Sequence, residues 1–70
     1  MDDQEFLHNL SVKTDVNIEL LKDLTTNEKF WPLIRTGKVI DAIHVLRDLQ
    51  PRVGLREAKM VVEAFVEQYK

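Results

Sequence analysis

The chain has 70 residues, 44% of them apolar, and a formal net charge of −2. This length allows one small domain, and the apolar content excludes a disordered tail. The absence of cysteine excludes disulfides and thiolate metal sites. No apolar run could span a membrane and the first residues are acidic, so we expect a soluble, cytoplasmic protein with no membrane partner.

The N-terminal part of the chain predicts two short helices. Residues 3–10 form the first, and residues 11–15 predict a polar turn, where Thr14 or Asp15 can cap the second helix. The second helix follows from apolar residues that recur every four positions, Val16, Leu20 and Leu24. Residues 16–20 also alternate in polarity as a strand would. We favour the helix, and the strand stays open as the alternative.

A third short helix is predicted before the first glycine. Thr25 and Glu28 have the spacing of a capping box. Because Pro32 lacks an N–H and clashes with a preceding turn, we expect a helix over residues 32–36, which Gly37 ends. Four apolar side chains of this segment are expected in the core: Phe30, Trp31, Leu33 and Ile34. For Trp31 the alternative is exposure at a binding surface.

Residues 38–49 predict an amphipathic helix with two distinct stripes. One stripe is apolar and should face the core; it comprises Val39, Ala42, Ile43, Val45, Leu46 and Leu49. The second stripe, Ile40, His44 and Arg47, lies about a right angle away, at positions i, i+4 and i+7. Ile40 is thus an apolar residue beside basic ones. The alternative is that Ile40 belongs to the core.

Residues 55–68 predict a second amphipathic helix, with Lys59 at the edge of its core stripe. Its core-facing residues are Leu55, Ala58, Val61, Val62, Phe65, Val66 and Tyr69. Gly54, directly before this helix, is most simply read as a glycine that lets the two helices pack closely. The two helices can bury their stripes only against each other and the rest of the chain.

These two helices resemble a known family. The run Gly37-Lys38-Val39-Ile40-Asp41-Ala42-Ile43-His44-Val45-Leu46-Arg47, followed by Gly54-Leu55-Arg56-Glu57-Ala58-Lys59-Met60-Val61-Val62-Glu63, is similar to the helical hairpin in the C-terminal domain of the bacterial ribosomal stalk protein. The resemblance covers residues 33–66. A weaker likeness is to the small helical domain of the elongation factor that exchanges guanine nucleotides. The strand, helix and strand that follow the hairpin in the stalk family have no counterpart here, so we expect a mostly all-α domain.

The resemblance implies a partner and a contact surface. In the stalk family the hairpin grips a helix of a translational GTPase with an apolar-basic patch. Carried over by position, the patch comprises Ile40, Ile43, His44, Arg47 and Lys59. His44 stands where the family has a lysine. A histidine, unlike a lysine, is only partly charged near neutral pH.

We expect a single domain in which a helical segment, residues 1–25, packs on the hairpin part, residues 26–70. The sequence predicts no enzyme, cofactor or metal site, because His8 and His44 have no neighbouring ligand pattern. The expected function is a protein-interaction module whose partner is a translation factor, or a host protein if the chain is a short viral or accessory product.

Two alternative functions stay open. One is a nucleic-acid-binding protein that uses Arg47, Arg52, Arg56 and Lys59, although the basic excess of residues 32–70 is smaller than such proteins usually carry. The other is a self-assembling structural protein. A core of this size rarely supplies more than about 3–5 kcal/mol of folding stability. We therefore expect a homodimer, whose interface would add to that stability.

Overall fold

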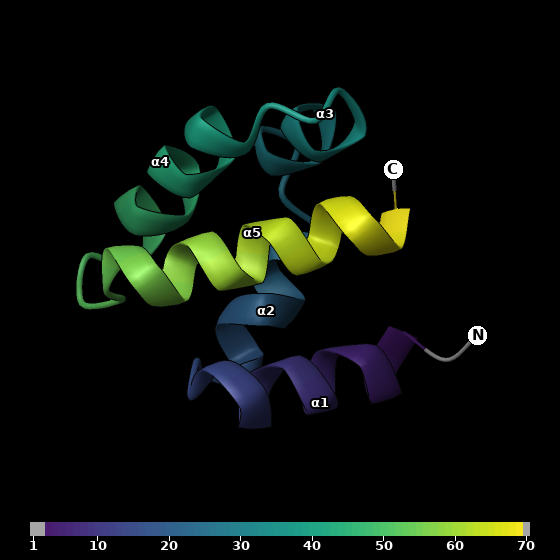
Figure 1. Ribbon diagram of the computed structural model, residues 1–70, viewed down its shortest axis with the longest axis vertical. Helices are drawn as coiled ribbons and strands as arrows, with labels where there is room; N and C mark the ends of the chain where they lie inside the picture. The colour runs from purple at the N-terminus through teal and green to yellow at the C-terminus, as the bar shows by residue number, and fades with distance from the viewer. Residues whose placement is uncertain (1–2, 70) are drawn as a thin grey trace.

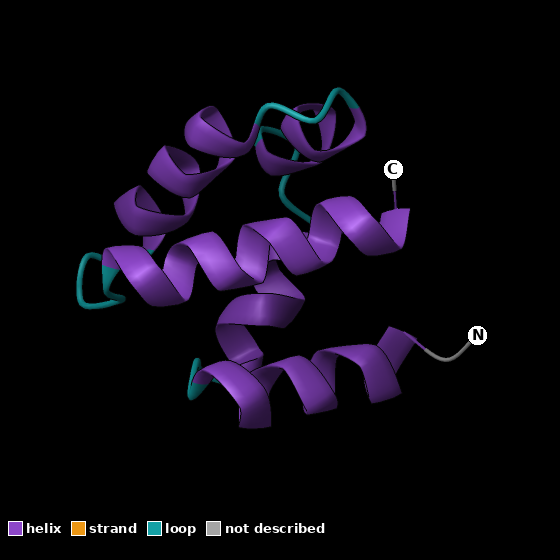
Figure 2. Ribbon diagram, in the orientation of Figure 1, coloured by secondary structure: helices purple, strands orange, loops and turns teal. Residues whose placement is uncertain are grey.

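The computed structural model describes residues 3–69, and this range contains five helices (Figures 1 and 2). They are α1 (Asp3–Thr14), α2 (Ile18–Thr25), α3 (Phe30–Arg35), α4 (Val39–Leu49) and α5 (Leu55–Tyr69). Residues 3–69 contain no strand, so the all-α prediction is confirmed. The helices predicted at 38–49 and 55–68 agree with α4 and α5 to within one residue at each end.

The other helices are arranged around α5, the longest of them (Figure 1). It packs against α1, α3 and α4, while α2 packs against α1 and α3. The loop at residues 50–54 joins α4 to α5, and the two helices form a hairpin. In Figure 1, α4 lies on one side of α5 and α1 on the other. The hairpin is therefore held in place by packing on both sides of its second helix.

The core is a single cluster of buried apolar side chains contributed by all five helices. Its centre is Phe65, which is fully buried. The Phe65 ring contacts the other four aromatic rings of the chain, Phe6, Phe30, Trp31 and Tyr69, at centroid separations of 5.4–6.1 Å. Three of these contacts are edge-to-face, a geometry that the ring quadrupoles favour. One residue of α5 thus connects α1, α3 and the end of its own helix.

α1 continues beyond its predicted end, so the predicted polar turn is wrong. The Thr14 hydroxyl donates to the Leu10 carbonyl at 2.7 Å, inside the helix. The Ser11 hydroxyl donates across the following turn to the Val16 carbonyl at 2.5 Å. These polar groups bond to backbone carbonyls without interrupting the helix. The helix ends where Asp15 takes a left-handed conformation, with φ of 58°.

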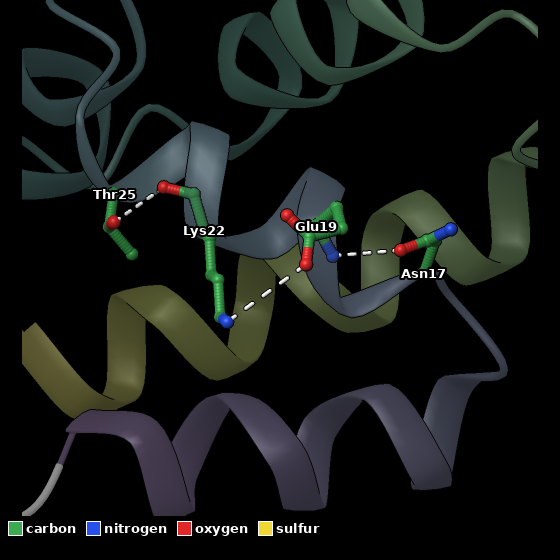
Figure 3. A network of polar contacts seen from close by, with 4 residues as sticks. All are labelled: Asn17, Glu19, Lys22 and Thr25. Atoms are coloured by element: carbon green, nitrogen blue, oxygen red, sulfur yellow. Dashed lines mark hydrogen bonds and ion pairs between the residues drawn. The ribbon is translucent and has the colours of Figure 1, made fainter.

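Asn17, rather than either predicted residue, caps α2. Its Oδ1 accepts a hydrogen bond from the Glu19 N–H at 2.8 Å (Figure 3). The Lys22 ammonium lies 4.0 Å from the Glu19 carboxylate, and the Thr25 hydroxyl donates to the Lys22 carbonyl at 2.6 Å. Such caps satisfy backbone groups that a short helix leaves unpaired. The helical alternative, and not the strand, is therefore confirmed from Ile18 onward.

α3 also begins at a different residue from the predicted one. The Asn27 side chain caps it by accepting hydrogen bonds from the Lys29 N–H at 2.8 Å and the Phe30 N–H at 3.0 Å. The predicted capping box is wrong, because the Thr25 hydroxyl bonds back into α2. Pro32 is the third residue of α3. Proline is tolerated in the first turn of a helix.

Gly37 ends α3, as predicted. It has a φ of 72°, and its N–H donates to the Ile34 carbonyl at 3.1 Å. The Lys38 N–H donates to the Leu33 carbonyl at 2.8 Å. This pair of bonds is the Schellman pattern, which needs a left-handed residue at this position. The turn sets the direction in which α4 leaves α3.

Gly37→Ala is expected to lower the free energy of unfolding by about 1–2 kcal/mol, because a Cβ in the left-handed region crowds the next carbonyl. Gly54→Ser is the matched control. Gly54 has no positive φ, and the three heavy atoms nearest to an added Cβ all belong to the flexible Glu57 side chain. Gly54 is thus not a point of close approach between the two helices.

Chemical denaturation of both variants measures the difference. A serine directly before α5 can cap it, so Gly54→Ser should leave the midpoint unchanged or slightly raised. Equal losses of stability in the two variants would contradict the structural difference between the two glycines.

Candidate functional site

One face of α4 combines an exposed apolar side chain with basic ones. Ile40 is 68% exposed, and His44 and Arg47 are exposed at positions i+4 and i+7 from it. This spacing aligns the three side chains along one side of the helix. The alternative that Ile40 belongs to the core is therefore wrong.

Ile43, in contrast, lies on the buried face of α4. It is only 5% exposed and forms the inner face of α4 with Ala42 and Leu46. α4 packs against both α3 and α5, so its buried face is wide enough to include Ile43. This burial agrees with the core-facing stripe that the sequence predicts, and it speaks against Ile43 as a partner contact, the role that the resemblance implied.

Lys59 lies on the second helix of the hairpin, where it lines a shallow cleft with Leu10 and Lys13 of α1. Its ammonium lies 3.9 Å from the Glu63 carboxylate, and the two side chains are 65% and 54% exposed. Such an exposed pair contributes about 0–1 kcal/mol, so Lys59 can exchange Glu63 for a partner's carboxylate at small cost. We refer to the exposed residues of the predicted contact surface, Ile40, His44 and Arg47 on α4 with Lys59 on α5, as the hairpin patch.

Two further apolar side chains are exposed, although the helical pattern assigns them to the core. Leu49 is 47% exposed and Leu55 is 60% exposed. They are the last residue of α4 and the first of α5, where packing neighbours are present only toward the helix interior. Their positions beside the predicted loop could have indicated this exposure. Leu49 marks a second apolar surface, separate from the hairpin patch.

Trp31 is half-buried, so it is partly the core residue that the sequence predicts. Its indole N–H donates to the Thr25 carbonyl, and its ring packs edge-to-face with that of Tyr69, with the ring centroids 4.9 Å apart. It lines a cleft with Thr25, Thr26, Glu28, Pro32, Arg35, Thr36 and Tyr69. The indole donor is already used inside the protein. The hairpin patch is therefore the better candidate for recognition.

Within the described part of the chain, no three or more histidine, aspartate or glutamate side chains are grouped to hold a metal ion. No helix in residues 3–69 is long and apolar enough to cross a membrane.

No protein-family model, curated protein sequence or solved structure matches this chain. α4 and α5 form a helical hairpin, the element that the resemblance to the ribosomal stalk protein concerns. The resemblance itself rests on the residues of the hairpin and stays a prediction.

Proposed function

We propose that this protein is a non-enzymatic interaction module that binds another protein through the hairpin patch. The observation that carries the proposal is the 68% exposure of Ile40 beside the exposed His44 and Arg47 on one face of α4. An apolar side chain at the centre of a contact, surrounded by charged groups, is a common arrangement at binding hot spots.

The chemistry of the patch indicates the kind of partner. Ile40 would fill an apolar hollow or pack between the side chains of a helix. Arg47 and Lys59 would pair with carboxylates at the rim, where charge steers association more than it adds affinity. An amphipathic helix with an acidic edge meets both requirements. The resemblance to the stalk protein suggests a translational GTPase, and a host protein is the corresponding partner for a viral or accessory product.

The test is a variant in which Ile40, Arg47 and Lys59 are all changed to alanine. All three side chains are exposed, so the variant should keep its helical circular dichroism and melt within a few degrees of the parent. Loss of the apolar anchor should cost about 2 kcal/mol or more in binding, roughly a thirty-fold weaker affinity. Capture from the lysate of the native host, followed by a titration with the identified partner, measures this loss.

The matched control changes Val12, Lys22 and Arg52 to alanine, which removes one exposed apolar and two exposed basic side chains from other surfaces. It should bind like the parent. If the patch variant is folded and binds as tightly as the control, the hairpin patch is not the recognition surface.

A nucleic-acid-binding function is the second candidate, because Arg47, Arg52, Arg56 and Lys59 are all exposed. Its affinity for nucleic acid would fall steeply and log-linearly with salt concentration. Failure to retain any nucleic acid at low salt would eliminate it.

A further inference from the structure

Leu49 is an exposed apolar side chain whose surroundings are acidic. Leu49 is 47% exposed and lies between two shallow depressions. One is lined by Asn27, Glu28, Lys29, Val45 and Asp48 as well as Leu49, and the other by Asn17, Glu19, Leu20, Asp23 and Gln50 as well as Leu49. We call Leu49 with Glu19, Asp23, Glu28 and Asp48 the acidic face.

The charges of this face are only weakly compensated. Four carboxylates surround Leu49, and one ammonium, that of Lys29, lies among them. Glu19 also pairs with Lys22, but at 4.0 Å and with both side chains at least half exposed. Like the hairpin patch, the acidic face thus has an apolar side chain at its centre, but the charged groups around it are negative instead of positive.

The two surfaces lie on opposite sides of the same helix. Leu49 is nine positions after Ile40 on α4, which corresponds to a rotation of about 180° and an advance of roughly 13 Å. One copy of the chain therefore cannot bring its own two surfaces together. A second copy can present the complementary one.

We propose that the chain associates head to tail, with the hairpin patch of one copy docked on the acidic face of the next. The proposal rests on the proposed function, because it names a second copy as one occupant of the hairpin patch. Ile40 and Leu49 would bury each other, and Arg47 would meet the carboxylates around Leu49. An interface between two different surfaces leaves one of each kind free, so the assembly grows into a ring or a filament. Self-association would compete with capture of another protein.

Sedimentation velocity of Ile40→Glu and Leu49→Lys, alone and mixed, tests the proposal. Both positions are exposed, so both variants should stay folded. The parent should pass beyond a dimer as its concentration rises, and each variant alone should remain an 8.2 kDa monomer. An equimolar mixture should form a dimer and no larger species, because it has one intact hairpin patch and one intact acidic face that fit each other. High salt should weaken this dimer.

A second pair, Arg47→Glu and Asp23→Lys, repeats the test with both apolar anchors intact. Lysine in the last turn of α2 suits the helix dipole, so this pair keeps the test valid if an anchor variant unfolds. A parent that stays monomeric at every concentration would overturn the proposal. So would a dimer that Ile40→Glu abolishes and Leu49→Lys leaves intact, which would be a symmetric contact through the hairpin patch alone.

Capture of another protein separates this inference from the proposed function. Leu49→Lys keeps the hairpin patch, so it should retain the partner protein that Ile40→Glu loses. Retention by both variants would contradict the proposed function, whatever the state of self-association.

Discussion

Phe65→Ala is expected to leave the chain largely unfolded at room temperature. Phe65 is fully buried and contacts the other four aromatic rings. Truncation of a buried phenylalanine costs about 3–5 kcal/mol, and the lost ring contacts put this position at the upper end of that range. A helical domain of this size rarely has more than about 3–5 kcal/mol in total. The loss therefore approaches the entire stability of the fold.

Far-UV circular dichroism and the fluorescence of Trp31 measure this loss. Trp31 is the only tryptophan of the chain, and its ring contacts Phe65 and Tyr69, so its emission reports on the cluster directly. Val12→Ala is the control, because Val12 is 73% exposed. If Phe65→Ala melts like this control, the aromatic cluster is not the centre of the core.

Leu46→Ala should also be strongly destabilising. Leu46 is fully buried on the inner face of α4, which packs against α3 and α5. The substitution removes three carbon atoms and leaves a cavity, at a cost of about 2–5 kcal/mol. Leu49→Ala, one turn further along the same helix, should cost less than about 1 kcal/mol, because Leu49 is 47% exposed.

Urea denaturation of the two leucine variants gives their free energies of unfolding under identical conditions. The two residues have the same side chain on the same helix, so their difference reports burial alone. Similar losses in the two variants would mean that the C-terminal end of α4 is packed more tightly than the structure describes.

The two amphipathic helices of the hairpin, α4 and α5, were the most predictable part of this chain. The apolar residues of α4 and α5 recur with a helical period over 11 and 15 residues, and a signal of this length tolerates single exceptions. The starts of α2 and α3, the two shortest helices, were less predictable. Several polar residues near the start of each helix could cap it, and only one does. Asn17 caps α2 instead of Thr14 because α1 extends through Thr14.

The candidate site was predicted in part. The angular position of Ile40 around the helix axis, its helical phase, correctly separated it from the core, because this angle determines on which side of the helix a residue lies. Phase does not state how many neighbouring helices cover that side. Phase also assigned Ile43 to the core, where it lies, but it assigned Leu49 and Leu55 there too, and these are exposed because they lie at helix ends. Which side chains are covered thus depends on how the helices pack together, and the pattern of a single helix does not contain that information.

The central claim is that partner recognition occurs at the hairpin patch. Its most direct test is a titration of the isotope-labelled protein with the captured partner, in which the chemical shift of each backbone amide is followed. The largest changes should occur at Ile40, His44 and Arg47 on α4 and at Lys59 on α5. Changes confined to the surroundings of Trp31, with the hairpin patch unaffected, would contradict the claim.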